Sequence, residues 1–331
     1  MKVCLYGELG RMLTGSGIGS AIDHQEKALL MNGVEVTRDY QDTYDLIDIN
    51  TIGPRSAYVA HKMRWNGVPV VIHSHTTVED LKDSFRFSTK LAPRLKSYLR
   101  YFYAQADLIV SPSDYTKGVL KDYGVKRTIA VISNGVDTEA FKPNEKARKQ
   151  CRREYALEGI VPYSVGHVFK RKGVVEFMEL AKYFPKTRFM WVGRNYKGFV
   201  DGAIKEAVEN KPDNVTFTGY VKDVVAAYLA GDIFVFPSWC ENQGISILEA
   251  AACGKPLIVR DLPTYDGWLE DGDNCLKARD TVEFARALNI LIHDRKAGEK
   301  LGKRAYEMSQ KHTLKKVGAR LKHAYETLLE R

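Results

Sequence analysis

The sequence has 331 residues, about twice the usual length of one globular domain, so it predicts two domains with a cleft between them. Its composition, 44% hydrophobic and 27% charged, is close to the globular average and excludes a disordered, collagen-like or coiled-coil chain. The net charge is +9. No stretch approaches the roughly 18 to 20 consecutive apolar residues of a membrane-spanning helix, so we expect a cytosolic protein without one.

Short β-branched runs alternate with segments of helical period, a pattern typical of parallel sheets covered by helices on both faces. In the first half, strands are predicted at residues 2–6, 34–37, 46–50, 69–73, 107–111 and 128–133. In the second half, they are predicted at residues 162–166, 188–193, 215–219, 233–237, 257–260 and 275–277. We therefore predict an α/β fold with two doubly wound, Rossmann-like domains.

The predicted joint lies near residues 134–160, where a turn at Asn134-Gly135-Val136-Asp137 precedes a polar, highly charged stretch. We assign residues 1–150 to the first domain and 151–311 to the second. The pattern is helical to the end of the chain, and residues 312–331 form a final helix that could cross back to the first domain.

Five cysteines without a C-x-x-C pair are expected to be reduced packing residues.

The positive charge is concentrated in two stretches. Residues 82–127 hold ten Lys and Arg against four Asp, and residues 142–153 hold six against a single Glu. Such a concentration predicts an anionic partner, either a membrane surface or a nucleic acid. The alternative for either charged stretch is that it simply forms a solvent-exposed surface without a partner.

Ligands of doubly wound sheets bind at the carboxyl ends of the strands, so the loops that follow them are the candidate site. After the first strand, Gly15-Ser16-Gly17-Ile18-Gly19 leads into a helical segment, where backbone N–H groups could meet a phosphate. A plain turn is the alternative. A dinucleotide-binding fingerprint has an acidic residue about 20 positions after its glycines, and Asp39 stands near that distance. The spacing of the glycines differs from the fingerprint, so a nicotinamide-dependent enzyme is the less favoured alternative.

Two histidines, His73 and His75, end a strand of the first half. A metal site would need further ligands, and none is evident; either ring could instead hydrogen-bond a core carbonyl. The spacing of Asp271-Gly272-Asp273 is also used by metal-dependent transferases of another fold, but its Gly/Asn surroundings favour a turn.

Two loops of the second half carry charged side chains. Residues 165–173 place Lys170, Arg171 and Lys172 between a strand and a helix, where they would neutralise a diphosphate unless they form a solvated run. In residues 236–250 a strand ends and a helix begins near Gly244. Glu241 falls in the loop and Glu249 on the helix, whose N-terminus offers unpaired N–H groups to an anion.

Together, the glycine loop, Ser133-Asn134-Gly135-Val136-Asp137, the loop at 166–173 and the Glu241/Glu249 segment resemble the family 4 retaining glycosyltransferases of GT-B fold, over most of the chain. The resemblance implies two Rossmann-like domains facing a central cleft. It implies that Lys172 neutralises the diphosphate of a nucleotide sugar and that Glu249 holds the ribose. The donor sugar would contact Glu241 and the residues after it, namely Asn242, Gln243, Gly244 and Ile245.

From the first domain, Gly17 and Gly19 would bring backbone N–H groups to the same phosphates, and His75 would contact the transferred sugar. Lys172, Glu241 and His75 are thus the candidate catalytic residues. His167 stands where the family usually has arginine, so Arg171 or Lys170 could supply the second phosphate-binding cation. The resemblance further implies same-face attack on the sugar, with no cofactor and no metal needed for the transfer step.

Within the family, the short length, the Glu-Asn-Gln-Gly variant and the His-Ser-His-Thr-Thr-Val-Glu-Asp run resemble bacterial diglycosyl-diacylglycerol synthases. These enzymes add a second hexose to a monoglycosyl-diacylglycerol. The resemblance implies a UDP-glucose or UDP-galactose donor, with UDP-glucose favoured, and a glycolipid acceptor. It also implies a peripheral location on the cytoplasmic face of the membrane; the oligomeric state stays open.

A basic stretch could provide the membrane-facing surface. Its cations are Arg86, Lys90, Arg94, Lys96 and Arg100, interleaved with apolar side chains that recur at helical spacing, Leu95, Tyr98, Leu99 and Phe102. Aromatic side chains could enter the bilayer interface while the cations meet anionic headgroups. The alternative is that the apolar residues face the protein core.

Other functions remain open from the residues alone. A family 4 enzyme could instead transfer galactose, or use a soluble or polysaccharide acceptor. A sugar-nucleotide epimerase or a nicotinamide-dependent enzyme would also use two nucleotide-binding domains. A nucleic-acid-binding protein would explain the positive charge, but no recognisable DNA or RNA motif supports it, and we expect no nucleic acid partner.

Overall fold

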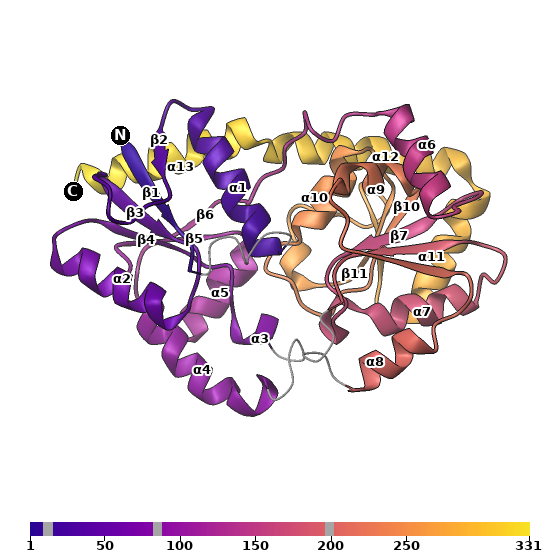
Figure 1. The fold of residues 1–331 in the computed structure, drawn as a ribbon, viewed down its shortest axis with the longest axis horizontal. Coiled ribbons are helices and arrows are strands. Elements are labelled where there is room, and N and C mark those ends of the chain that lie inside the picture. The colour runs from indigo at the N-terminus through magenta and orange to yellow at the C-terminus, as the bar shows by residue number, and fades with distance from the viewer. Residues whose placement is uncertain (9–15, 82–87, 196–201) are drawn as a thin grey trace. The chain divides into compact units, whose positions relative to one another are not determined.

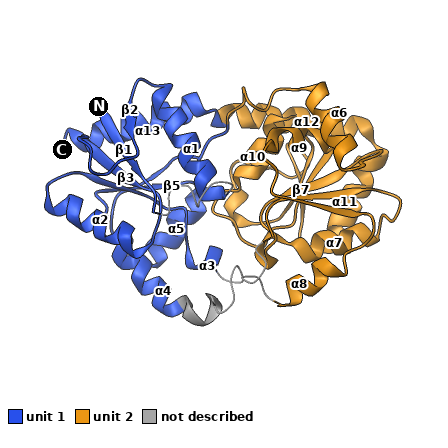
Figure 2. Ribbon diagram, viewed as in Figure 1, with its two compact units in different colours: residues 1–81, 89–136, 312–331 blue, residues 82–88, 137–311 orange. Residues whose placement is uncertain are grey.

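The structure is a computed structural model that describes residues 1–8, 16–81, 88–195 and 202–331, with the backbone alone for residues 88–92. The chain divides into two compact units (Figure 2). The first comprises residues 1–81, 89–136 and 312–331, and the second centres on residues 137–311. Each unit contains one six-stranded sheet.

The sheet of the first unit is entirely parallel, in the order β2-β1-β3-β4-β5-β6 (Figure 1). Its strands are β1 (Lys2–Tyr6), β2 (Glu35–Thr37), β3 (Leu46–Ile49), β4 (Val70–His73), β5 (Leu108–Ser111) and β6 (Ile129–Val131). The helices are α1 (Gly17–Leu30), α2 (Pro54–Trp65), α3 (Val78–Leu81), α4 (Ser88–Tyr103), α5 (Asp114–Asp122) and α13 (Leu314–Leu329).

Alternate side chains of these strands pack against helices on opposite faces of the sheet, as a doubly wound fold requires. On one face, Ile72 belongs to a core shared with α2, α4 and α5. On the other face, its neighbour Val71 belongs to a core shared with α1 and α13.

The second unit repeats this architecture with strand order β12-β11-β10-β7-β8-β9, again entirely parallel. Its strands are β7 (Pro162–Val165), β8 (Phe189–Val192), β9 (Val215–Gly219), β10 (Ile233–Phe236), β11 (Leu257–Arg260) and β12 (Leu276–Ala278). The helices are α6 (Glu145–Glu154), α7 (Val174–Lys182), α8 (Gly202–Glu209), α9 (Val224–Ala230), α10 (Ile245–Ala252), α11 (Thr281–His293) and α12 (Arg295–Ser309).

Aromatic side chains fill both faces of this second sheet. On one face, Trp191 of β8 packs edge to face against Phe177 of α7, with ring centroids 5.2 Å apart, in a core that also contains side chains of α11. On the opposite face, the Tyr163 ring packs against Tyr228 of α9 and Phe234 of β10. All twelve predicted strands are confirmed, most to within one residue at each end, and so is the predicted class of two doubly wound domains.

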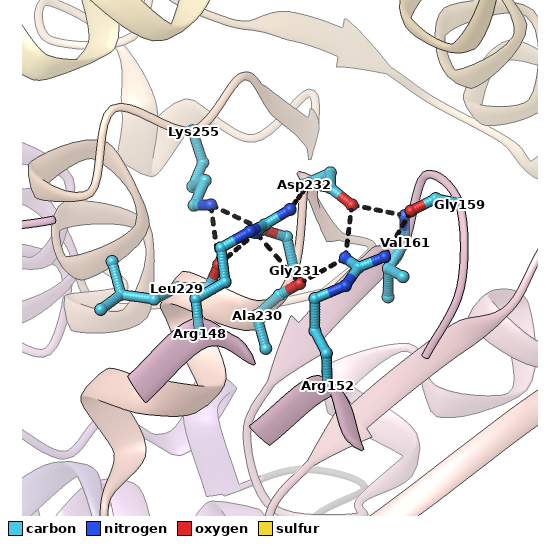
Figure 3. Close-up of polar contacts among 9 residues, drawn as sticks. All are labelled: Arg148, Arg152, Gly159, Val161, Leu229, Ala230, Gly231, Asp232 and Lys255. Carbon is cyan, nitrogen blue, oxygen red and sulfur yellow. Dashed lines mark hydrogen bonds and ion pairs between the residues drawn. The ribbon is translucent and has the colours of Figure 1, made fainter. Parts of the chain in front are cut away.

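The division between the units falls at residue 136, earlier than the predicted boundary at residue 150. Figure 3 shows why α6 belongs to the second unit: Arg148 and Arg152 of this helix both contact the Asp232 carboxylate, at 2.6 and 3.0 Å. Arg148, Arg152 and Lys255 also donate to backbone carbonyls at the C-terminal end of α9. Cations are favourable at a helix C-terminus, so these contacts hold α6 to residues some 80 positions away.

Residues 312–331, predicted as a final helix that could cross back to the first domain, lie in the first unit. The Val136 N–H donates to the His312 carbonyl at 2.9 Å, and α13 packs along α1. Gly318 permits this close approach, because a Cβ at that position would lie 2.0 Å from the Ala28 carbonyl oxygen of α1.

The basic helix α4 faces the protein with its apolar stripe. Leu99 and Phe102 are fully buried, and Leu95 and Tyr98 pack partly buried on the same core. These side chains therefore face the protein core and not a bilayer. They are buried because α4 covers one face of the sheet. The cations Arg94, Lys96 and Arg100 are exposed, whereas Arg86 and the side chain of Lys90 lie outside the described residues.

Candidate active site

A charged cluster forms where two strands of the second unit end. After β7, a short 3-10 turn (Lys170–Lys172) carries the three predicted cations. Lys172 Nζ lies 2.5 Å from Glu241 Oε1, in the loop that follows β10. Arg171 donates to the Cys240 carbonyl at 2.6 Å and lies 3.5 Å from Glu241. The structure therefore brings Arg171 and Lys172 together with Glu241, whereas Lys170 is exposed.

The Glu241 side chain is buried, and its Oε1 has several partners. Ser238 donates to its Oε1 at 2.6 Å, and Thr264 donates to its backbone carbonyl at 2.7 Å. Burial raises the pKa of this carboxyl, but the charges of Lys172 and Arg171 and the hydrogen bonds from Lys172 and Ser238 outweigh it and hold the pKa below its usual value. Glu241 is therefore an anion at neutral pH, flanked by two cations.

Gly173 sets how closely the two loops approach. Its φ is +75°, and a Cβ at this position would lie 2.3 Å from the Pro237 carbonyl oxygen. No other residue type has both the left-handed freedom and the missing side chain that this contact needs. The glycine thus fixes the 3-10 turn against the end of β10.

Helix α10 begins beside this cluster at Ile245, after Gly244 with φ +90°, and no side chain caps its N-terminus. Asn242 and Gln243 lie in the loop just before it, and Gln243 is buried. Glu249 lies one turn into the helix, buried, and accepts a hydrogen bond of 2.5 Å from Tyr228. The two glutamates, eight positions apart, therefore have separate partners.

His167, at the position where the resembling family usually has arginine, is held neutral. Burial lowers the pKa of its imidazole to about 4, helped by the nearby charges of Lys172, Arg194 and Arg171. It therefore supplies no charge near pH 7, whereas Arg171 does.

The predicted phosphate loop of the first unit leads into the N-terminus of α1, as expected from the sequence. Ser16 caps α1, and its hydroxyl accepts from the Gly19 N–H at 3.1 Å. The Gly19 N–H is thus engaged in a helix cap. Gly17 is the exposed first residue of α1, and Gly15 lies outside the described residues.

The two histidines at the end of β4 have different surroundings. His73 is buried, with Nε2 3.0 Å from the Asp48 carboxylate rather than from a core carbonyl. His75 is partly exposed, and its Nε2–H donates to the Asn50 amide oxygen at 2.9 Å. Burial and the neighbouring His73 lower the pKa of His75 to about 3, so it is neutral at physiological pH.

Sequence reasoning missed the side chains that hold these residues. Ser238, Thr264 and Asn50 follow strands closely, and this position was the signal that could have found them. Tyr325 of α13 donates to Asp48, which also accepts from Gln25 of α1 at 2.6 Å. These partners come from segments up to 277 residues apart.

Asp271-Gly272-Asp273 forms a turn, as predicted, with Gly272 at φ +76°. Asp271 accepts from the Lys277 N–H at 2.8 Å, and Asp273 pairs with Arg304 at 3.1 Å. In the described part of the chain, no group of three His, Cys, Asp or Glu side chains is placed to hold a metal ion. None of the described helices combines the length and apolar character needed to span a membrane.

Comparison with known proteins agrees with this architecture. Residues 149–308 match the model of the glycosyl transferases group 1, and residues 27–140 match that of glycosyltransferase family 4. The solved structures of HepE from Anabaena, in complex with UDP and glucose, and of sucrose-phosphate synthase from Thermosynechococcus elongatus superpose with TM-scores of 0.82 and 0.83. Each likeness covers at least 99% of both chains, at 18% and 19% identity, and shows the GT-B fold.

Similarity to proteins of assigned activity is higher. The processive diacylglycerol alpha-glucosyltransferase of Acholeplasma laidlawii is 34% identical over 100% of this chain and 99% of its own. The alpha-galactosylglucosyldiacylglycerol synthase of Streptococcus pneumoniae is 29% identical over 72% of this chain and 67% of its own. The chain therefore belongs to glycosyltransferase family 4. It is a hexosyltransferase of GT-B fold, as the resemblance implied.

Proposed function

We propose that this glycosyltransferase moves glucose from UDP-glucose to a monoglucosyl-diacylglycerol and so makes a diglycosyl-diacylglycerol membrane lipid. The observation that carries the proposal is the cluster of Arg171, Lys172 and Glu241 in a chain that is similar over its full length to a diacylglycerol glucosyltransferase. HepE, of the same fold, binds UDP and glucose, which supports the choice of donor.

Breaking the bond between a sugar and a nucleoside diphosphate places negative charge on the departing phosphate. Lys172 and Arg171 are fixed cations at the end of β7, and the uncapped start of α10 presents N–H dipoles beside them. Preorganised charges of this kind stabilise a transition state without needing to reorganise during the reaction. In the proposal, the diphosphate competes with Glu241 for Lys172, and Glu249 binds the ribose hydroxyls.

Glu241 then turns toward the donor sugar, together with the backbone of residues 242–245. His75 contributes a neutral ring, because its lowered pKa keeps it uncharged, and it hydrogen-bonds a sugar hydroxyl rather than transferring charge. The departing phosphate accepts the proton of the attacking hydroxyl, so the new bond forms on the face that the diphosphate leaves. This mechanism retains the configuration at the anomeric carbon and uses no metal in the transfer step.

The acceptor is a lipid, so the enzyme must meet a membrane surface. Exposed Arg94, Lys96 and Arg100 of α4 support binding to anionic headgroups, each contributing roughly 1 kcal/mol near such a surface. Because the apolar stripe of α4 is in the core, this contact is electrostatic for the described residues and weakens with salt. The proposal places the enzyme at the cytoplasmic face of the membrane.

The test is transfer of radiolabel from UDP-glucose into the lipid phase of vesicles that contain monoglucosyl-diacylglycerol. Lys172→Ala should lower kcat by about 10²- to 10³-fold, the usual effect of removing one fixed donor to a developing negative charge. Lys182→Ala, an exposed lysine of α7, is the matched control and should leave kcat unchanged. Near-normal turnover of Lys172→Ala, or loss of turnover with a chelator, would contradict this mechanism.

Transfer of galactose is the second candidate, because a relative of 29% identity is named for a galactosyl product. Running the same assay with UDP-galactose separates the two donors. Label that stays in water-soluble products would point to a soluble acceptor. Interconversion of the donor without any transfer would point to an epimerase.

A further inference from the structure

The polar side chains at the ends of β3 and β4 form a connected series of contacts. His75 Nε2 lies 2.9 Å from the Asn50 amide oxygen. The Asn50 amide nitrogen lies 3.4 Å from the Asp48 backbone carbonyl oxygen and 3.5 Å from Asp48 Oδ1. Asp48 is fully buried and Asn50 is 1% exposed, whereas His75 is partly exposed. The series therefore runs from a buried carboxylate to the imidazole that contacts the sugar in the proposed function.

The Asp48 carboxylate is held in place through its other oxygen, Oδ2. Gln25 of α1 donates to this oxygen at 2.6 Å, and Tyr325 of α13 also donates to it. His73 Nε2 of β4 lies 3.0 Å from the same atom. Since these partners come from three elements that pack together, the carboxylate has a fixed position, and its Oδ1 is directed at the Asn50 amide.

The oxygens of Asp48 decide which way the Asn50 amide points. An amide has a donor NH2 group on one side and an acceptor oxygen on the other. In the structure, the NH2 group faces two acceptors, a backbone carbonyl and a carboxylate oxygen. If the amide were turned by half a rotation, its oxygen would face both of these oxygens in a buried place, where repulsion and a lost donor are costly. The amide oxygen therefore points at His75.

This orientation determines which nitrogen of the His75 ring carries the hydrogen. An amide oxygen only accepts, so Nε2 must be the donor in the 2.9 Å contact. Burial and the neighbouring His73 lower the pKa of His75 to about 3, so the neutral ring holds a single N–H near pH 7. The second ring nitrogen, Nδ1, is then an acceptor, and a hydroxyl that bonds to it must donate.

We infer that Asn50 is a positioning residue: supported by the Asp48 carboxylate, it holds His75 in the Nε2–H tautomer, so that Nδ1 accepts a hydrogen bond from a hydroxyl of the donor sugar. The inference rests on the proposed function for the identity of that hydroxyl. In the other tautomer, Nδ1 would present a hydrogen at the same place and would demand the opposite role of the hydroxyl. Fixing the tautomer before the sugar arrives preorganises the contact.

NMR reads the tautomer directly, through two-bond 1H–15N correlation spectra of the imidazoles in the full chain. His75, assigned by the loss of its signals in His75→Ala, should show the Nε2–H form alone. Asn50→Leu removes the acceptor without leaving room for a water, so the Nδ1–H form should appear. Asn32→Leu is the control, since this asparagine of the same unit donates to backbone carbonyls of α1 and α13, and the spectrum of His75 should not change.

Asn50→Asp is the conservative variant. Two neighbouring carboxyls retain one proton between them, so the new carboxyl can donate to Asp48 and still accept from His75. We therefore expect Asn50→Asp to keep the Nε2–H form that Asn50→Leu loses. Should Asn50→Leu fail to fold, Asn50→Ala, which removes the same amide, takes its place.

Transfer kinetics separate positioning from a purely structural role. Asn50→Leu should lower kcat/KM for UDP-glucose about tenfold, the usual effect of losing one hydrogen bond, and Asn50→Asp should recover most of it. The Kd of UDP, which lacks the sugar, should stay unchanged. In a His75→Ala background, Asn50→Leu should cause no further loss, because a residue that acts through His75 then has nothing left to position.

Three results would overturn the inference. The first is an Nδ1–H signal from His75 in the unaltered enzyme, and the second is an Nε2–H form that survives Asn50→Leu unchanged. The third is an equal loss of kcat/KM from Asn50→Leu with and without the His75 ring, because Asn50 would then only support the fold. A tautomer that depends on Asn50, in an enzyme that moves no label from UDP-glucose to a glycolipid, supports the assignment of the ring and contradicts the proposed function instead.

Discussion

The two units share one architecture but carry opposite chemistry at the ends of their strands. In the first unit, His75 is neutral and bonds to an amide, and the Asp48 carboxylate is buried among hydrogen-bond donors. In the second, two cations surround one carboxylate. The same fold thus offers one surface suited to uncharged hydroxyls and one suited to a diphosphate. Both sheets are six-stranded and their strands pair in parallel, so we attribute the contrast to the side chains that follow the strands.

The largest effect that this comparison predicts comes from Gly173, which fixes the cations of the second unit. Gly173→Ala combines a left-handed φ of +75° with a Cβ 2.3 Å from the Pro237 carbonyl, so the 3-10 turn must move. We expect a loss of at least 2 to 3 kcal/mol in stability, roughly the strain of a disfavoured backbone plus a clash, and a more than tenfold fall in kcat. Denaturant unfolding and the vesicle assay measure the two effects.

Gly159→Ala is the matched control for this variant. Gly159 also has a left-handed φ, +62°, but a Cβ there would meet nothing within 4 Å. We expect only the backbone strain, roughly 1 to 2 kcal/mol, and an unchanged kcat. Equal effects of the two variants would show that the approach to Pro237 does not position the cations.

In the first unit, the corresponding test is the buried network around Asp48. Tyr325→Phe removes a donor to the Asp48 carboxylate, which is fully buried and is then left with fewer partners. We expect a loss of about 1 to 3 kcal/mol in stability, because a buried charge loses a hydrogen bond. The Kd of UDP should not change, because the proposed donor contacts of the charged cluster are all in the second unit.

Tyr58→Phe provides the comparison, since this tyrosine of α2 is 60% exposed and should change stability by less than about 0.5 kcal/mol. Calorimetric titration with UDP checks the binding of both variants. A marked weakening of UDP binding in Tyr325→Phe, without loss of fold, would contradict the separation of roles between the two units.

The sequence predicted the strands well because β-branched runs and their alternation with helical segments are local signals, as in 215–219 and 257–260. It also located the charged loops, since they directly follow strands. It could not pair Lys172 with Glu241, which are 69 positions apart, or Tyr325 with Asp48, because periodicity carries no information about long-range contacts. The division at residue 136 falls within the predicted joint of 134–160, but the sequence could not assign α6 to the second unit, because Arg148 contacts a residue 84 positions away.

The smallest expected effect is a pH dependence that both units share for different reasons. An unfolded histidine binds a proton near pH 6.5, whereas folded His167 and His75 have pKa values of about 4 and 3. The unfolded state therefore binds more protons between these values, so stability is full above about pH 7 and is lost as the pH falls below 6.5. His167→Gln should make the fall in the free energy of unfolding between pH 7 and 5.5 smaller by about 1 kcal/mol. His61→Gln, at an exposed histidine of α2, is the control and should leave that fall unchanged.

Salt then separates the two histidines. Burial is the largest cause of the lowered pKa of both histidines. The charges of three cations lower the pKa of His167 further, whereas the second cause for His75 is the neighbouring His73. Added salt screens the charges and leaves burial unchanged, so the pKa of His167 should rise toward its usual value more than that of His75. NMR titration of the two imidazoles at low and high ionic strength measures this. Equal shifts would mean that the cations of the second unit do not act on His167, which would weaken the electrostatic contrast between the two units.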